Sequence, residues 1–212
     1  MAGELLSAAG ADAIRRAVAA AEAESGAEIV PVVAPASDDY RSATWAGVAA
    51  GALGGAALAA LPVDGLRIAG GWAPAALAFA GALVGCLLAE VPRLRRRLAG
   101  SAALGLRVEQ AAGREFLRHE LFRTRDRTGV LIYVSLFERR VSVLADEGVY
   151  RAVAQEKWDE LARAVAAGMK SRPAELVLLE AVSSAGALVK EFGPRRRSDD
   201  ANELPDAPRA AT

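Results

Sequence analysis

Two long runs of uncharged residues interrupt an otherwise amphipathic chain. The first extends from Ala43 to Val63 and the second from Ile68 to Ala89, with Asp64 and Arg67 in the short link between them. A helix needs about 20 residues to cross the hydrocarbon core of a bilayer, so each run is long enough. A water-exposed helix carries a polar stripe, and neither run has one. The pattern predicts a transmembrane helical hairpin at residues 43–91; a pair of alanine-rich core helices in a soluble protein is the alternative.

Glycine recurs at every fourth position within both runs. Residues four apart share a helix face, and small side chains there let two helix backbones approach closely. We therefore expect these glycines to form the contact between the two helices, and chance spacing is the alternative. They are Gly47, Gly51, Gly55, Gly81 and Gly85. Trp45 and Trp72 lie near the ends of the runs, as residues at a membrane interface often do.

Basic residues gather on one side of the predicted hairpin. Cytoplasmic flanks of membrane helices carry an excess of Lys and Arg, and the link between the runs offers only Arg67, offset by Asp64. This predicts a two-span protein of the cell membrane with both termini in the cytoplasm. Anionic lipid headgroups are the expected partners of the flanking arginines. These are Arg93, Arg95, Arg96 and Arg97.

The sequence on either side of the hairpin reads as alternating helices and strands. Residues 129–135 are apolar on both faces, as in a central strand between helix layers, and residues 140–146 follow as an antiparallel partner. Residues 27–34 predict another strand, in which Pro31 favours an edge position. Helices are predicted at residues 11–25 (with Asp12 as N-cap), 104–122 (with Leu106, Ala112, Phe116 and Leu117 in the core), 154–168 and 173–192.

These elements predict one discontinuous α/β domain. Residues 1–42 and 93–194 together suffice for a single core. A helical crossover between the first two strands makes them parallel. The expected fold is a three-layer α/β/α sandwich with a small mixed sheet, interrupted by the hairpin. Residues 195–212 are polar and proline-dotted, and we expect them to be disordered.

Composition narrows the possible functions. Lys and Arg number 26, as do Asp and Glu, so no net positive charge favours nucleic-acid binding. Cys86 is the only cysteine and His119 the only histidine, which excludes an intrachain disulfide and leaves little for a histidine-based metal site or triad. We expect His119 to face outward from the helix at residues 104–122 or to pack at its end, as a capping or surface residue.

The motifs of the α/β part resemble the TPM domain. The resemblance rests on Arg125–Ser135, Glu138–Val141, Ala145–Val149 and the opening segment Ala23–Val30. Residues 202–206 are similar to the tail of a bacterial membrane subgroup in which a transmembrane hairpin interrupts the domain. The resemblance implies an α/β/α sandwich. Members of the family are described as acid phosphatases, photosystem-repair factors or membrane-receptor modulators, many of them on the extracytoplasmic side.

Two acidic groups are candidate sites for Ca²⁺ or Mg²⁺, which prefer several oxygen ligands at one point. One combines Asp146, Glu147 and Asp126 at the edge of the sheet distal to the membrane. The other combines Asp38 and Asp39 with the Glu138–Arg139 turn at the proximal edge. Local bonding of each carboxylate to backbone N–H groups is the alternative. The hydroxyls near strand ends are those of Thr128, Ser135 and Ser142, and no glycine-rich phosphate cradle accompanies them.

Two functions follow from these features. The first is a non-catalytic, membrane-anchored module that binds another membrane protein or maintains membrane proteins at the inner face of the membrane. The second is a metal-dependent phosphomonoester hydrolase that uses the Asp146 group. The sequence displays no nucleophile and base at recognisable spacing, which favours the first function.

Overall fold

The computed structural model describes residues 6–61, 72–169, 171–193, 204 and 206–210. The chain divides into two compact units, one of residues 1–37 and 106–212 and the other of residues 38–105. The arginine segment at 93–97 therefore belongs to the hairpin unit, whereas the sequence assigns it to the α/β domain. The reason is that the helix carrying these arginines packs against both hairpin helices.

The first unit contains a four-stranded mixed sheet. Strands β1 (Glu28–Ala34) and β2 (Gly129–Ser135) are parallel and paired along their full length, and β3 (Arg140–Ala145) is antiparallel to β2. The short β4 (Arg209–Ala210) runs parallel to β1 on its other side, so the order is β3-β2-β1-β4. The predicted parallel pairing and the predicted antiparallel turn are both confirmed.

The sheet is covered on both faces because β1 and β2 are apolar at consecutive positions. All residues of both strands are buried. Successive side chains point to opposite faces, so alternate residues enter two different cores. One core takes Ile29, Val33, Val130, Ile132 and Val134, and the other takes Val30, Val32, Ala34, Leu131 and Tyr133.

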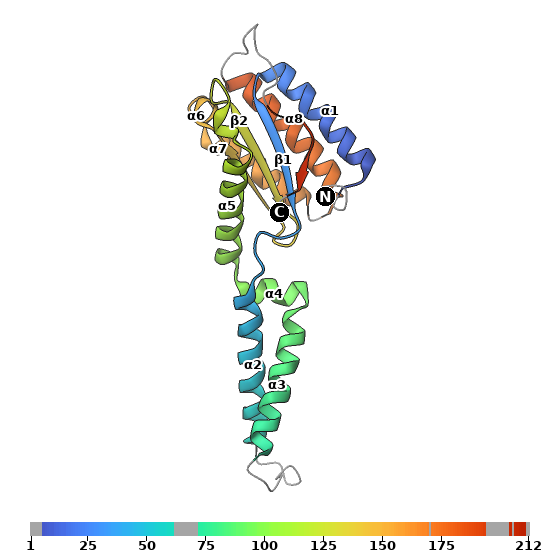
Figure 1. Ribbon diagram of the computed structural model, residues 1–212, viewed down its shortest axis with the longest axis vertical. Helices are drawn as coiled ribbons and strands as arrows, with labels where there is room; N and C mark the ends of the chain where they lie inside the picture. Colours follow the sequence, from blue (N-terminus) through green and yellow to red (C-terminus); the bar gives the residue numbers. More distant parts are fainter. Residues whose placement is uncertain (1–5, 62–71, 170, 194–203, 205, 211–212) are drawn as a thin grey trace. The chain divides into compact units, whose positions relative to one another are not determined.

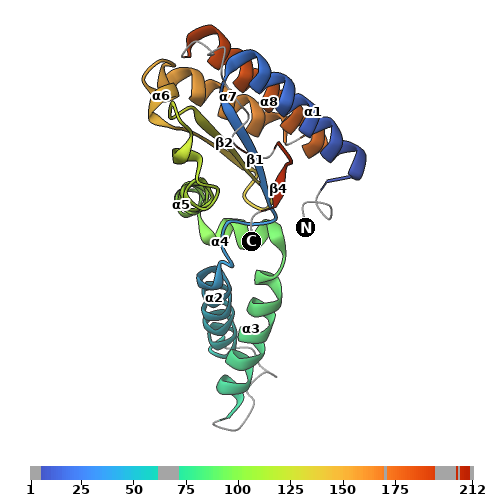
Figure 2. The same ribbon diagram turned by 45° about the horizontal axis from the view of Figure 1, so that its top comes forward.

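Helices α1 (Ala8–Ser25), α7 (Gln155–Gly168) and α8 (Ala174–Phe192) cover the first of these faces, and the four-residue helix α6 (Glu147–Tyr150) follows β3. Figures 1 and 2 show α1 and α8 side by side. Helix α1 begins earlier than predicted: Ser7 is the N-cap and its hydroxyl accepts the N–H of Gly10 at 3.0 Å. Asp12 instead pairs with Arg15 at 2.7 Å.

Helix α5 (Ser101–Arg118) and the short 3-10 helix η2 (Leu121–Arg123) cover the opposite face. The predicted core position Ala112 is confirmed, and Phe116 packs at the margin of the core. Leu106 and Leu117 are 54% and 63% exposed, so the prediction that places them in the core is wrong. Val108 and Ala111 occupy the buried face instead, and the two leucines lie on the opposite side of the helix.

Two predictions for the strands and the tail are corrected. Strand β1 is not an edge, because β4 pairs with Val32 and Val33. This pairing starts one residue beyond Pro31, so the missing N–H of the proline does not interrupt it. Residues 209–210 form a strand, although the composition predicts disorder for the whole tail. Most of the rest of the tail, including residues 194–203, lies outside the described residues.

The second unit consists of helices α2 (Arg41–Ala59), α3 (Ala73–Ala89) and α4 (Pro92–Ala99). Helix α2 is long and apolar enough to cross a membrane, with a mean hydropathy of 1.2. Helices α3 and α4 satisfy the same criterion only together and are bent by 100° at the break between them. The described residues thus contain one helix of this kind, or two if the bent pair is a single span. The predicted link residues Asp64 and Arg67 lie outside the described residues.

Candidate functional site

The contact between α2 and α3 is made by the glycines that the sequence singles out. A Cβ atom on Gly51 would lie 2.1 Å from the carbonyl oxygen of Gly81, and one on Gly85 would lie 2.1 Å from that of Gly47. A Cβ on Gly55 would lie equally close to the carbonyl oxygen of Leu77. Real Cβ atoms do not approach oxygen so closely, so the two backbones pack at a distance that only glycine permits.

The outer surface of the same helix pair carries large apolar side chains. Trp45, Leu53, Phe79 and Leu87 are each about 70% exposed, at 70%, 72%, 68% and 72%. Helix α2 contains no charged residue after Arg41, and α3 contains none. The pair therefore buries small residues and exposes large apolar ones, which is the reverse of a helix pair in water.

Helix α4 follows α3, and its side chains lie in three different environments. Leu94 and Leu98 line an apolar groove of about 470 Å³ together with residues of α2 and α3. Arg95 donates to the carbonyl oxygen of Asp39 at 2.8 Å and lies 3.7 Å from Glu90. Arg93, Arg96 and Arg97 line a separate pocket of about 460 Å³ with Gly100, Ser101 and Leu104.

Asp146, the centre of the predicted metal site, makes a two-pronged ion pair with Arg127. The guanidinium donates to Oδ1 at 2.8 Å, and its Nε lies 2.7 Å from Oδ2. The side-chain pKa of Arg127 is raised by this hydrogen bond. Asp146 is buried and is also the N-cap of α6, accepting the N–H of Glu147 at 2.8 Å. Both oxygens thus fix the start of α6 to the loop before β2.

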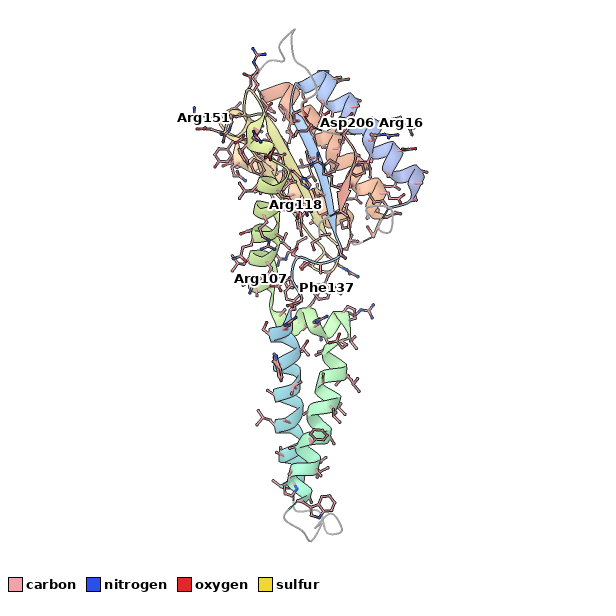
Figure 3. The ribbon with its side chains drawn as sticks, viewed as in Figure 1. Arg16, Arg107, Arg118, Phe137, Arg151 and Asp206 are labelled. Atoms are coloured by element: carbon pink, nitrogen blue, oxygen red, sulfur yellow. The ribbon has the colours of Figure 1, made fainter. Side chains whose placement is uncertain are left out.

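The other predicted metal ligands do not converge on Asp146. The Glu147 carboxylate pairs with Arg151, which Figure 3 labels at the surface beside α6. Among the described residues, no three His, Cys, Asp or Glu side chains are grouped so that they could hold a metal ion. The backbone of Asp126 packs closely against Gly148: a Cβ on Gly148 would lie 2.2 Å from the carbonyl oxygen of Asp126. The binding of Ca²⁺ or Mg²⁺ here stays a prediction.

Glu138 organises the opposite edge, where β1 and β2 both end. Its carboxylate accepts the N–H of Ser37 at 2.8 Å and the hydroxyl of Ser135. The Ser37 hydroxyl shares a hydrogen bond of 3.1 Å with the Tyr133 hydroxyl. Burial raises the pKa of Tyr133, and the Glu138 charge acts in the same direction. All four residues are buried, so this cluster joins the β2–β3 turn to the end of β1.

The remaining residues of that predicted group satisfy local backbone. Asp38 accepts the N–H of Asp39 at 2.7 Å and that of Tyr40 at 3.4 Å. Asp39 pairs with Arg41 at 2.7 Å. Of the other predicted hydroxyl residues, Thr128 is buried and its N–H donates to the Thr124 hydroxyl at 3.0 Å, whereas Ser142 is half-buried in β3.

A buried polar cluster that the sequence does not predict lies on the α5 face of the sheet. The Nη1 of Arg209 donates to Nδ1 of His119 at 2.6 Å, and the carboxylate of Glu115 lies 3.1 Å from Nε2. Arg118, labelled in Figure 3, lies 3.6 Å from the same carboxylate. Burial, followed by the charges of Arg209 and Arg118, lowers the pKa of His119 to about 4. His119 is only 13% exposed and follows the last residue of α5, so it packs at the end of the helix, which is one of the two expected arrangements, and does not face outward.

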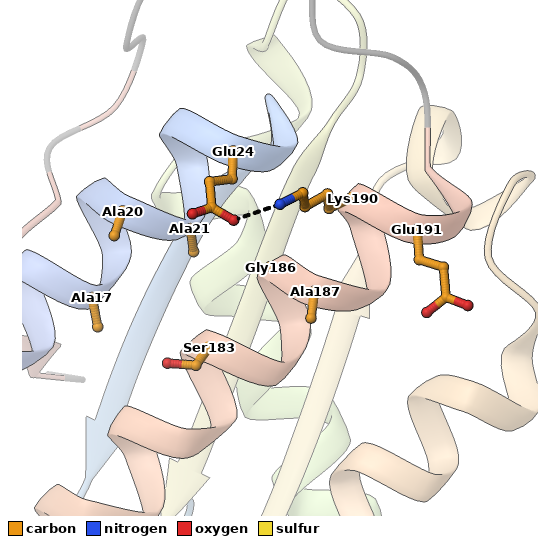
Figure 4. A pocket seen from close by; sticks show the side chains of 9 residues that line it. All are labelled: Ala17, Ala20, Ala21, Glu24, Ser183, Gly186, Ala187, Lys190 and Glu191. Atoms are coloured by element: carbon orange, nitrogen blue, oxygen red, sulfur yellow. Dashed lines mark hydrogen bonds and ion pairs between the residues drawn. The ribbon is translucent and has the colours of Figure 1, made fainter.

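The α1–α8 contact carries a shallow groove of about 570 Å³ on its outer side. Figure 4 shows its small floor residues, with the Glu24–Lys190 ion pair of 2.9 Å at one end. A Cβ on Gly186 would lie 2.5 Å from that of Ala21, so the helices touch beneath the groove. Its lining residues are Ala17, Ala20, Ala21, Glu24, Ser183, Gly186, Ala187, Lys190 and Glu191.

Comparisons with known proteins bear on the fold. No family model matches the chain, and no curated protein matches it. The chain is similar to the NMR structure of the BA42 protein from the psychrophilic bacterium Bizionia argentinensis, with a TM-score of 0.58 and 18% sequence identity. The similarity covers 97% of this chain and 94% of that chain. At this identity the likeness is one of fold, and the resemblance to the TPM domain stays a prediction from the motifs.

Proposed function

We propose that the chain is a membrane-anchored module with a TPM-like α/β domain, held by the α2–α3 hairpin, that binds another membrane protein at the inner face of the cell membrane. The observation that carries the proposal is the reversed polarity of the hairpin. Lipid contributes no hydrophobic drive between helices, so helices in a bilayer associate through close backbone packing and turn large apolar residues outward. The glycine contact and the exposed Trp45, Leu53 and Phe79 fit this requirement.

The arginines of α4 support the proposed orientation. They follow α3 directly, and none of the described residues of α2 and α3 between Arg41 and Glu90 is charged. Placing α4 on the cytoplasmic side agrees with the usual bias of basic residues and puts both termini in the cytoplasm. Reporter fusions test this: both ends should be active only as cytoplasmic reporters, and an extracytoplasmic C-terminus would contradict the orientation.

The internal contacts of the motif residues support a binding role over a catalytic one. Asp146 and Glu138, the acidic residues of the family-like motifs, are buried and bonded to Arg127, Ser37 and Ser135. Their carboxylates position loops of the domain. A general acid, base or nucleophile needs access to a substrate, which these buried groups do not have.

Partner capture from intact membranes tests the proposal. A photoreactive residue at Ala187 should form adducts with a membrane protein, because the α1–α8 groove is a recess of about 570 Å³ that opens on the outer side of the domain. The matched control is the same residue at Arg163, which is exposed on α7. Equal labelling at both positions, or turnover of a generic phosphate ester that Asp146→Asn abolishes, would contradict a non-catalytic binding role.

A further inference from the structure

The pocket beside α4 concentrates positive charge in one place. Three of its six lining residues are Arg93, Arg96 and Arg97, and none is acidic. These arginines are spaced three and four apart and therefore share one face of α4. The side chains of Arg93, Arg96 and Arg97 give the pocket a positively charged lining, which attracts an anion.

The fourth arginine of α4, Arg95, does not line this pocket. Arg95 is engaged by the carbonyl oxygen of Asp39 and by Glu90, so it fastens α4 to neighbouring segments. On the other side of the helix, Leu94 and Leu98 line the apolar groove with α2 and α3. Gly100, with φ of 79°, then turns the chain into α5 and closes the pocket wall. Only glycine adopts this backbone conformation without strain.

We propose that this pocket binds the phosphate of an anionic glycerophospholipid headgroup, an inference that rests on the proposed membrane insertion of the hairpin. Helix α4 is bent by 100° from α3. With α3 taken as the second span by itself, α4 lies along the bilayer surface at headgroup level and does not continue the span. The apolar face with Leu94 and Leu98 suits the acyl boundary, and the arginine pocket suits the headgroup. Guanidinium groups bind phosphate through two parallel hydrogen bonds, which a lysine cannot reproduce.

The test uses the full chain in neutral detergent micelles, titrated separately with dioleoylphosphatidylglycerol, dioleoylphosphatidylcholine and inorganic phosphate. Native mass spectrometry gives the affinity of the first bound molecule. We expect tighter binding of phosphatidylglycerol than of phosphatidylcholine. Changing Arg93, Arg96 and Arg97 together to Gln should weaken phosphatidylglycerol binding on the order of 100-fold. The charge-matched control changes Arg16, Arg139 and Arg163 to Gln and should have no such effect.

A second variant separates a shaped site from general charge. Changing the same three residues to Lys keeps the charge and should still lose most of the preference for phosphatidylglycerol. Full binding by the Lys variant, equal binding of both lipids, or tighter binding of inorganic phosphate than of the lipid would overturn the inference. Flotation with phosphatidylcholine vesicles tests insertion separately: the Gln variant should float like the unaltered chain, and failure of both to float would refute the proposed function instead.

Discussion

Gly51 and Gly81 face each other across the α2–α3 contact, and a Cβ on either would lie 2.1 Å from the carbonyl oxygen of the other. No side chain can be added at these positions without separating the helices. Both residues belong to rows of glycine four positions apart in the sequence, so the residues that the pattern singles out are the ones in contact. It also provides an internal control, since a Cβ on Gly54 of the same helix would meet nothing within 4 Å.

The first prediction uses this control. Gly51→Val should destabilise the hairpin contact by about 1–3 kcal/mol, because the added atoms force the two backbones apart. Gly54→Val adds the same atoms on an open face and should change the stability little. Thermal unfolding of the full chain in micelles measures both variants. Equal loss in the two would mean that the close contact does not hold the helices together.

The second prediction concerns the Arg127–Asp146 pair. Asp146→Ala removes the N-cap of α6 and the buried carboxylate that Arg127 contacts, so we expect a loss of about 1–2 kcal/mol in the free energy of unfolding, most of it from the lost cap. Glu147→Ala, at the neighbouring exposed position, should cost less than about 1 kcal/mol. Denaturant unfolding distinguishes the two. A small effect of Asp146→Ala would show that the pair does not anchor α6.

The unaltered chain tests the hypothesis that Ca²⁺ or Mg²⁺ binds at Asp146. Because Arg127 contacts both oxygens of Asp146, we expect millimolar Ca²⁺ or Mg²⁺ to leave the melting temperature unchanged. Stabilisation by either ion that disappears in Asp146→Asn would instead establish a cation site at this edge of the sheet.

The third prediction concerns the Glu138 cluster. Glu138→Ala removes the acceptor of the Ser37 N–H and the Ser135 hydroxyl. Because both donors are buried, water does not readily take the place of the lost carboxylate, and the donors are left without an acceptor. We expect a loss of about 2–4 kcal/mol. Arg139→Ala, at the exposed neighbouring position, should change the stability by less than about 1 kcal/mol. Comparable effects of the two changes would argue against a positioning role for Glu138.

The fourth prediction is a pH dependence of stability. The pKa of His119 is about 4 in the folded chain and near 6.5 in the unfolded chain, so the unfolded state binds the proton more readily. The contribution of neutral His119 to the free energy of unfolding is fully present above pH 6.5. It is lost as the pH falls toward 4, at up to about 1.4 kcal/mol per pH unit. The melting temperature should therefore fall between pH 7 and pH 5.

His119→Gln isolates this effect, because it removes the only histidine and leaves every carboxylate in place. The fall in melting temperature between pH 7 and pH 5 should become smaller in the variant. An unchanged fall would show that other groups produce it and that protonation of His119 does not oppose folding.

Elements whose pattern is local are predictable from the sequence. The predicted bounds of β2 match the observed ones and those of β3 agree within one residue, because continuous apolar runs between turn residues are strong signals. The glycines of the hairpin follow from their spacing alone. The N-cap of α1 is not predictable in this way, because Asp12 and Ser7 both suit that position and the choice depends on which hydrogen bond forms.

Contacts between distant parts of the chain are not predictable from one sequence. His119 and Arg209 are 90 residues apart, and neither lies in a pattern that points to the other. The eight-residue α4 reads only as a basic flank, since its short length and initial Pro92 give little helical signal. Asp146 lies beside another acidic residue in the sequence and therefore suggests a metal ligand. Nothing in that stretch of sequence shows that Arg127 contacts both of its carboxylate oxygens in the fold.

The central claim is that the α2–α3 hairpin lies in a lipid bilayer. A Cys86→Ser background, spin-labelled singly at Leu53, Phe79 or Ala187 and placed in phosphatidylglycerol–phosphatidylcholine vesicles, tests it through collisions with oxygen and with a water-soluble nickel complex. Leu53 and Phe79 are 72% and 68% exposed on the hairpin, so both labels should be accessible to oxygen and shielded from nickel. The label at Ala187 should show the opposite. Nickel accessibility at Leu53 and Phe79 equal to that at Ala187 would contradict insertion.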